Sequence, residues 1–503
     1  MEGSDSDVPV PRVMSTQHPD NATSPFFSEG DVLEDEDEIQ EAYYVYSHLG
    51  CDEQMWDFEG KEGDEYAVKK LLSRYEQFFS ETRIGDDVRL TVRGPNPDVE
   101  ESEAKILLEI LESIPRSYDA AETFYSEKGS EIDEQSHGTA PIFEVIIPMT
   151  TSADQINTVR SYYEKFVVGK EEREVWGDKT LRDWVGEFRP REIDVIPLIE
   201  DRQHMLDAHE ILREYAADKD IESQRVFLAR SDPALNYGSL SAVLINKVSL
   251  QRLYDTADEI GVDVHPILGV GSAPFRGNLK PTNTETVTEV YPEVRTFTVQ
   301  SAFKYDYPVE DVRDGIETLR STQVERSDRF DEDRALDIVD RVADEYSSQV
   351  ERIAPVVNRM AKYVPDRRSR KLHVGLFGYS REIGEESLPR AISYTASLYS
   401  IGFPPEMMGL SALEPDDLDF IETVYPTFYE DLRDAVRFYN PRSLEVVPID
   451  DGKVEKALEL VDVVRDRHHE EATTEVIEAL GREDTDAIRS GVQRAAWQRK
   501  FLG

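Results

Sequence analysis

Residues 193–200 read Ile-Asp-Val-Ile-Pro-Leu-Ile-Glu, and residues 225–232 read Arg-Val-Phe-Leu-Ala-Arg-Ser-Asp. Each stretch is an apolar run that ends in a carboxylate, Glu200 in the first and Asp232 in the second. The two acids are 32 residues apart, which is about the length of one strand–helix–strand unit. Such a unit makes its strands parallel and neighbouring, so both acids should emerge at the same carboxyl edge of a sheet. The spacing predicts an α/β fold with its active site at that edge.

Two carboxylates at one sheet edge suit Mg²⁺, with Mn²⁺ as a possible substitute. Hard cations prefer oxygen ligands and keep coordination positions for water and substrate. Glu200 and Asp232 are therefore the candidate metal ligands. The alternative is that both are ordinary charged residues at the start of surface loops. A zinc site is not expected, because His204 and His209 are five residues apart and fall on different faces of a helix.

Short apolar runs recur along the chain between amphipathic segments. Strands are predicted at Val13–Thr16, Val88–Arg93, Phe143–Pro148, Ile193–Glu200, Arg225–Ser231, Val264–Gly269, Val294–Gln300 and His373–Gly378. Helices are predicted at Glu101–Ser113, Ala153–Phe166, Arg202–Ala217, Leu240–Ile260, Val312–Arg320 and Ala335–Met360. Eight strands alternating with helices predict a (β/α)₈ TIM-type barrel elaborated with additional α-helices. Leu444–Ile449 is a ninth strand candidate, so the count alone does not prove the barrel.

The domain organisation follows from the same pattern. Residues 1–11 are rich in Ser, Asp and Pro and are expected to be a disordered tail. Residues 12–503 are expected to form a single barrel domain, since no low-complexity linker divides them. We expect a helical insertion around residues 303–371 and a helical C-terminal segment around residues 450–503. These added helices are the candidates for a subunit interface.

The composition is strongly acidic, with 104 Asp and Glu against 57 Lys and Arg and a net charge of −47. Nucleic acid and anionic membranes are poor partners for such a surface. The acids are spread along the whole chain, which favours a halophilic protein from a salt-loaded cytoplasm. The alternative is an acidic protein with flexible loops. A single cysteine, Cys51, and the lack of a signal-like or membrane-spanning run predict a cytoplasmic enzyme.

Two further stretches carry residues suited to chemistry. Residues 15–21 read Ser-Thr-Gln-His-Pro-Asp-Asn and put His18 on a rigid turn, where it could act as an acid or base or be merely structural. Residues 269–278 read Gly-Val-Gly-Ser-Ala-Pro-Phe-Arg-Gly-Asn. This glycine-rich loop with Arg276 favours anion binding over a plain turn, and it matches neither a dinucleotide fingerprint nor a Walker loop.

A third stretch places Arg381 at the end of a predicted strand and Arg390 at the start of a predicted helix. The two arginines could grip a phosphate or carboxylate, or they could form surface salt bridges. Arg93, at the end of another predicted strand, is a weaker candidate of the same kind.

Taken together, these motifs resemble the archaeal-type phosphoenolpyruvate carboxylases over nearly the whole chain. The residue 15–21 stretch looks like that family's opening signature, and Pro-Leu-Ile-Glu at 197–200 is similar to the metal-binding Pro-Leu-Phe-Glu of the longer carboxylases. Arg-Ser-Asp-Pro at 230–233 is similar to their Tyr-Ser-Asp-Ser. Arg276-Gly277 resembles their glycine loop, and Ser380-Arg381 and Pro389–Ile392 resemble their two later arginine segments.

The resemblance implies an enzyme that joins bicarbonate to phosphoenolpyruvate and gives oxaloacetate and phosphate through carboxyphosphate and an enolate. It implies Mg²⁺ on Glu200 and Asp232 and His18 as the base. Arg276, Arg381 and Arg390 would neutralise the phosphate. It also implies a homotetramer. The substrate-binding candidates are Arg93, Arg230, Gly271 and Gly277.

The chain departs from the longer carboxylases at Gly269-Val270-Gly271, which lacks their His and Arg, and at Leu235, where they have a lysine. Their inhibitor-binding C-terminus is not recognisable, so the resemblance does not settle whether aspartate or malate regulates this chain. The nearest alternative is another Mg²⁺-dependent TIM-barrel enzyme of pyruvate enolate chemistry, an aldolase or lyase. A non-catalytic acidic scaffold is the alternative from a different class.

Overall fold

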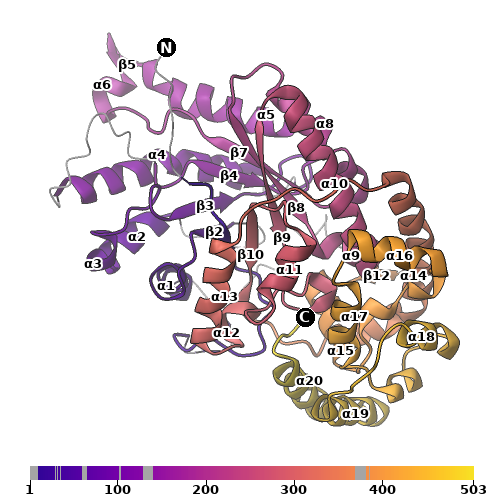
Figure 1. Cartoon of the computed structure of the whole chain (residues 1–503). Coiled ribbons are helices and arrows are strands. Elements are labelled where there is room, and N and C mark those ends of the chain that lie inside the picture. Colours follow the sequence, from indigo (N-terminus) through magenta and orange to yellow (C-terminus); the bar gives the residue numbers. More distant parts are fainter. Residues whose placement is uncertain are drawn as a thin grey trace.

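The computed structural model describes residues 9–28, 30, 32–33, 36–58, 65–100, 104–127, 140–368, 381–383 and 386–503. Within these residues, eight parallel strands close a barrel in the order β1-β10-β9-β8-β7-β4-β3-β2, and helices surround it (Figure 1). The barrel strands are β1 Val13–Ser15, β2 Glu53–Asp57, β3 Arg89–Arg93, β4 Glu144–Ile147, β7 Asp194–Ile199, β8 Ser223–Ala229, β9 Asp263–Gly269 and β10 Thr296–Val299. The predicted (β/α)₈ barrel is confirmed.

Helices connect the strands of the barrel, and further helices come after the last strand. In its first half they are α1 Glu36–Tyr44, α2 Ala67–Arg74, α3 Glu76–Phe79, α4 Ala104–Glu127, α5 Ala153–Tyr162, α6 Leu181–Val185, α7 Arg202–Leu206 and α8 Ala208–Ala216. In the second half they are α9 Ser231–Tyr237, α10 Ser239–Ile260, α11 Thr284–Val290, α12 Ser301–Tyr305, α13 Val309–Ser321 and α14 Glu332–Ala361. The remaining helices are α15 Ala391–Tyr399, α16 Pro415–Val424, α17 Phe428–Val436, α18 Asp451–Leu458, α19 Arg467–Arg482 and α20 Thr485–Arg499. Each predicted helix coincides with one or more of these.

The expected additional helices gather on one side of the barrel. The 30-residue α14 packs against α9, α10 and α15, and α19 packs against α20 (Figure 1). Two small hairpins lie outside the barrel, one of β5 Glu174–Trp176 with β6 Lys179–Thr180 and one of β11 Arg381–Ile383 with β12 Glu386–Leu388. The division into a tail and a single domain remains a prediction.

The barrel interior changes character from one end to the other. Near the amino ends of the strands, Arg225 bonds Glu53 at 2.7 Å and Glu144 at 2.9 Å, and Arg89 bonds Glu144 at 3.0 Å. The middle is filled by apolar side chains, among them Phe227. The carboxyl end therefore stays open for a site, as in other barrels of this kind.

Strand β2 was not among the predicted strands, and its position inside the barrel explains why. Glu53 and Asp57 are buried, Glu53 against Arg225 and Asp57 against Arg93. A strand that carries charges at both ends does not show the apolar run used to find its neighbours. The burial is tolerated because each carboxylate has an arginine partner.

Two of the strand candidates do not correspond to a described strand. Leu444–Ile449 is not a strand: a 3₁₀ turn covers Pro441–Glu445, and a loop follows. Its apolar residues Val447 and Ile449 are buried all the same, and burial alone does not separate a strand from a packed loop in so short a run. The candidate His373–Gly378 lies outside the described residues.

Candidate active site

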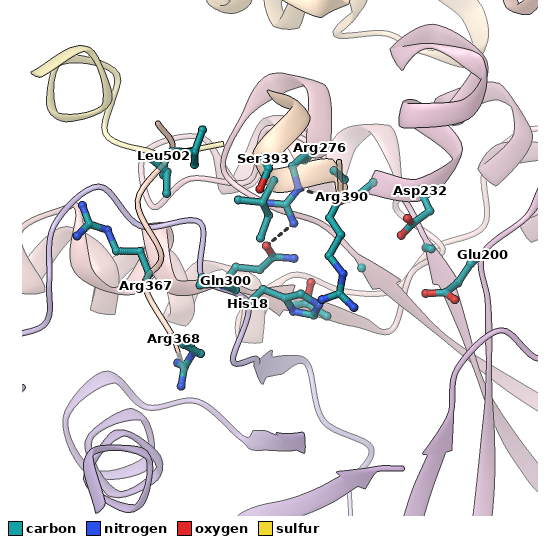
Figure 2. Close-up of a pocket in the computed structure, with 18 of the residues that line it drawn as sticks. His18, Glu200, Asp232, Arg276, Gln300, Arg367, Arg368, Arg390, Ser393 and Leu502 are labelled. Carbon is teal, nitrogen blue, oxygen red and sulfur yellow. Dashed lines mark hydrogen bonds between the residues drawn. The ribbon is translucent and has the colours of Figure 1, made fainter. Parts of the chain in front are cut away.

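A cavity of about 460 Å³ opens at the carboxyl end of the barrel (Figure 2). It is lined by residues from strand ends, from the loops that follow them and from the added helices. The polar and charged lining residues are His18, Arg93, Glu200, Ser231, Asp232, Arg276, Thr298, Gln300, Asp366, Arg367, Arg368, Arg390 and Ser393. Five of these are arginines, in a protein whose net charge is −47. A concave, cationic site of this kind attracts small polyanions in spite of the acidic surface.

The two predicted metal ligands lie on the same cavity (Figure 2). Glu200 directly follows β7 and Asp232 stands in the first turn of α9, just after β8. The two strands are parallel neighbours, with Leu198 opposite Phe227, so the spacing argument is confirmed. The backbone N–H of Met149 donates to Glu200 at 3.1 Å, which fixes one oxygen of this buried carboxylate.

The chemistry of this pair fits a divalent cation. Two carboxylates supply hard oxygen donors and face a cavity with room for water and substrate. Within the described ranges no group of three or more His, Cys, Asp and Glu residues is arranged to hold a metal. A protein contribution of two ligands is typical of Mg²⁺ and Mn²⁺ sites, which use substrate and water for the remaining positions.

Arg276 is held rigidly in the cavity wall by partners from four parts of the chain. Its Nε donates to Ser231 at 3.1 Å, and its Nη2 donates to Gln300 at 2.7 Å. Its Nη1 donates to Asp20 at 3.3 Å and to the carbonyl of Gly503 at 2.9 Å. A guanidinium fixed in this way loses little conformational entropy when an anion binds.

The charges around Arg276 are balanced within the wall. Burial lowers the pKa of the Arg276 guanidinium, and the carboxylates of Asp20 and Asp232 oppose that change. Burial raises the pKa of the Asp20 carboxyl, while Arg276 and the N–H of Ala302 act in the opposite direction. Asp20 was not predicted as a site residue, because its contact with Arg276 spans 256 residues.

Two glycines of the loop are required by the packing around Arg276, one because it leaves room for a neighbour and one because of its backbone conformation. A Cβ atom on Gly271 would lie 2.8 Å from Nη1 of Arg276 and 3.1 Å from Oε1 of Gln300. Gly277 has a φ of 119°, and a Cβ there would lie 2.6 Å from a methyl of Val270. Neither glycine lines the cavity. Gly271 makes room for the Arg276 guanidinium, and Gly277 permits the turn that presents it.

His18 also faces the cavity, from the turn after β1. Its Nδ1 lies 2.9 Å from the hydroxyl of Thr16, and its carbonyl accepts from the N–H of Ser301 at 3.2 Å. In Figure 2 the His18 ring and the Arg390 guanidinium lie toward the middle of the view, with Glu200 and Asp232 to one side. The structure thus brings the predicted base, both acids and two of the three arginines predicted to neutralise the phosphate, Arg276 and Arg390, to one cavity.

The remaining arginine candidates take three different positions. Arg93 lines the cavity but makes a bidentate ion pair with Asp57, at 3.0 and 2.7 Å. Arg230 is buried outside the lining and donates to the carbonyl of Phe275 at 3.3 Å and to Ser239 at 3.0 Å. Arg381 lies in β11, and the structure describes only its backbone.

Arg367, Arg368, Gln300 and Ser393 also line the cavity and were not predicted. Arg367 donates to the carbonyls of Asn21 at 3.1 Å and Ala22 at 2.8 Å, so it fixes the chain just after the His18 turn. Arg368 bonds Glu41. The sequence marks this pair only as two adjacent arginines after α14, and no strand or glycine signal accompanies them.

Comparisons with known proteins identify relatives that match nearly the whole chain. The family model described as phosphoenolpyruvate carboxylase matches residues 10–503. A phosphoenolpyruvate carboxylase from Halobacterium salinarum is 63% identical over 497 residues, covering 99% of this chain and 100% of that protein. The enzyme of the same name from Methanothermobacter thermautotrophicus is 53% identical over 494 residues, covering 98% and 100%. That from Pyrococcus abyssi is 47% identical over 497 residues, again covering 98% and 100%.

Proposed function

Because the chain belongs to the phosphoenolpyruvate carboxylase family, we propose that it joins bicarbonate to phosphoenolpyruvate to give oxaloacetate and phosphate. One observation carries the assignment of this activity to a site. His18, Arg276, Arg390, Glu200 and Asp232 line a single cavity at the carboxyl end of the barrel. The family match favours carboxylation over the aldolase or lyase chemistry that the same acids could serve.

The first step transfers the phosphoryl group to bicarbonate. A bicarbonate oxygen attacks phosphorus, the bond from phosphorus to the enol oxygen breaks, and the electron pair stays on that oxygen as an enolate. Arg276 and Arg390 bind the phosphoryl oxygens and orient them for this displacement. Arg381 is proposed for the same role, and Arg93 is the candidate for the substrate carboxylate. Arg230, Gly271 and Gly277 are proposed to act indirectly, by shaping the loop that presents Arg276.

The second step releases carbon dioxide and forms the new carbon–carbon bond. His18 takes the carboxyl proton of carboxyphosphate, the bond between carbon and the phosphate oxygen breaks, and phosphate leaves with that electron pair. The enolate carbon then attacks the carbon dioxide beside it. The apolar walls from Leu198, Phe227 and Val364 support this step, because a water-poor cavity protects the enolate from protonation to pyruvate.

Glu200 and Asp232 are proposed to hold Mg²⁺, with Mn²⁺ as a substitute. A bound divalent cation supplies positive charge where the substrate carboxylate and enol oxygen become most negative. The two carboxylates would hold the cation at the carboxyl ends of β7 and β8, and the N–H of Met149 keeps Glu200 in place.

A coupled assay tests the function directly. Phosphoenolpyruvate, bicarbonate and Mg²⁺ are supplied in molar KCl, and oxaloacetate is followed through malate dehydrogenase. We expect oxaloacetate that depends on bicarbonate and on the divalent cation, and activity that falls at low salt, as the acidic composition predicts. Aldehyde and pyruvate formed from a longer acid, without need for bicarbonate, would favour the lyase alternative.

We also propose that the protein is a homotetramer in a cytoplasm. Support for an oligomer comes from a tryptophan surface formed by Phe166, Val175, Trp176, Trp184 and Val185, where Trp176 is 87% and Trp184 61% exposed. Phe166 lies on the π-helical turn Tyr163–Val168 that follows α5. The other four residues lie on the β5–β6 hairpin and α6, which precede β7 at the end of the barrel away from the cavity (Figure 1). As for the membrane, none of the helices in the described residues is long and apolar enough to span one.

The charges around the tryptophan surface favour a second copy of the chain as its partner. Residues 165–191 hold seven basic and six acidic residues, whereas the whole chain has a net charge of −47. Two copies can therefore meet here with little of the repulsion that other faces would create. A twofold contact places one patch against its own copy, and a patch with charges of both signs can complement itself there.

Changing both Trp176 and Trp184 to glutamate is expected to split the oligomer into smaller species, because it places charge in an apolar contact. Sedimentation velocity in molar KCl measures the change. Trp497→Glu is the matched control, since Trp497 is 54% exposed on α20. A double variant that sediments like the parent would show that this surface is not a subunit contact.

A further inference from the structure

Behind the His18 turn lies a buried ionic cluster to which the proposed mechanism gives no role. It consists of Glu41 on α1, Lys304 on α12, Arg368 and Tyr305. The Glu41 and Lys304 side chains are both completely buried. Burying two charges is costly unless their geometry and hydrogen bonding are complete, so a cluster at this place needs either a structural or a functional explanation.

Every donor of Lys304 has an acceptor. Nζ donates to Glu41 at 2.8 Å, to the hydroxyl of Ser15 at 3.0 Å and to the carbonyl of Thr16 at 2.9 Å. Glu41 also accepts two bonds of 2.6 Å from Nη2 of Arg368 and one of 2.6 Å from the hydroxyl of Tyr305. Although burial acts to raise it, the pKa of Glu41 is held well below its ordinary value by Arg368 and Lys304. The contacts with Arg368 and Lys304 therefore favour the ionised form of this carboxyl group.

The cluster touches the active site at two points. Arg368 lines the cavity directly (Figure 2). Lys304 reaches it through Thr16, whose carbonyl it binds and whose hydroxyl lies 2.9 Å from Nδ1 of His18. The N–H of Thr16 donates to the carbonyl of Val299 at 3.0 Å. Thr16 is thus held at both backbone atoms while its side chain contacts the histidine.

We propose that Lys304, held by Glu41, and Thr16 are positioning residues that fix the ring orientation and tautomer of His18. This inference rests on the proposed role of His18 as the base. When the Thr16 hydroxyl accepts from Nδ1–H, Nε2 becomes the basic nitrogen of the ring. Lys304 keeps that hydroxyl in place, because it anchors the backbone from which the hydroxyl projects. A base displaced by about 1 Å loses roughly a hundredfold in rate.

The readout is the fate of the enolate. If His18 is misplaced, phosphoryl transfer continues while removal of the carboxyphosphate proton slows, and the enolate is protonated to pyruvate. We expect Lys304→Met and Thr16→Val to raise the ratio of pyruvate to oxaloacetate by roughly tenfold or more, within the hundredfold range that misplacement allows. Thr16→Ser, which keeps the hydroxyl, should restore the ratio of the parent. Lactate dehydrogenase and malate dehydrogenase measure the two products separately.

Lys247 provides a matched control for the loss of a buried lysine. Its Nζ also donates to a carbonyl, a carboxylate and a hydroxyl, those of Val290, Glu293 and Ser327, at 2.9, 2.9 and 2.7 Å. None of these groups lines the cavity. Lys247→Met should lower thermal stability as much as Lys304→Met does and leave the product ratio unchanged.

Three outcomes would overturn the inference. One is a Thr16→Val variant with the product ratio of the parent. The second is a Lys304→Met variant that folds and behaves like Lys247→Met. The third is a Thr16→Ser variant whose ratio of pyruvate to oxaloacetate is raised as much as that of Thr16→Val. If Lys304→Met does not fold, the Thr16 pair still decides the question. Failure of the proposed function is recognised separately, since the parent would then form no oxaloacetate, or His18→Asn would leave the ratio unchanged.

Discussion

Replacing His18 with asparagine is expected to lower oxaloacetate formation by about 10²–10⁴-fold, the usual contribution of a general base. Consumption of phosphoenolpyruvate should fall much less, because Arg276 and Arg390, which bind the phosphoryl group, stay in place. The unused enolate should then appear as pyruvate, together with phosphate, and only when bicarbonate is present. The measurement is the ratio of pyruvate to oxaloacetate at saturating bicarbonate.

Asparagine suits this test because it keeps a polar group near Thr16 while it removes the basic nitrogen. Thermal unfolding in molar KCl serves as the control, since an unchanged melting temperature shows that the turn after β1 still folds. Oxaloacetate formed at close to the parental rate would show that His18 is not the base. Loss of both products would place His18 in the first step.

Changing Asp232 to asparagine, or Glu200 to glutamine, is expected to suppress both steps together. Each change removes one negative charge from the pair of acids and weakens the proposed cation site. A bound cation contributes several kcal/mol of transition-state stabilisation, so we expect a loss of at least about a hundredfold in kcat/KM. The ratio of pyruvate to oxaloacetate should stay that of the parent, which separates these variants from His18→Asn.

The cation itself gives a second readout for these variants. The concentration of Mg²⁺ or Mn²⁺ needed for half-maximal activity should rise, and binding of Mn²⁺ to the protein without substrate, followed by electron paramagnetic resonance, should weaken. Asp201→Asn is a suitable control because Asp201 follows Glu200 directly, does not line the cavity and caps α7 through the N–H of His204. An unchanged cation requirement in both variants would refute the role of the two acids as ligands.

Much of the fold could be predicted because most barrel strands are apolar on both faces. Strands β7 and β8 are flanked by helices and by the filled barrel interior, so their carboxyl-terminal parts, Val195–Ile199 and Val226–Ala229, are continuous apolar runs. Strand β2 was not predicted because its inward positions are the charged residues Glu53 and Asp57, which pair with arginines from other strands. The partner Arg225 lies 172 residues away from Glu53, and no local pattern reports so distant a contact.

In the candidate site, too, some residues could be predicted from the sequence and others could not. Glu200, Asp232, Arg276 and His18 stand directly after strands or in the glycine loop, where parallel strands must bring them to one edge. Arg367 and Arg368 come from the segment after α14, and only the packing of that segment over the barrel carries them to the cavity. Arg230 directly precedes two cavity residues, yet its side chain is buried against Phe275 and Ser239. Position in the sequence gives a residue's place on the backbone but not the direction of its side chain.

The sequence by itself determined the alternation of strands and helices, the edge at which the two acids emerge and the acidic character of the surface. These properties depend on local periodicity, on chain spacing and on composition, all of which act over short distances or over the whole chain at once. The tertiary structure alone decided which arginines face the cavity, that Asp20 holds Arg276 and that Lys304 anchors the turn of His18. Those contacts join residues that are hundreds of positions apart, and their geometry exists only when the closed barrel and its added helices are packed together.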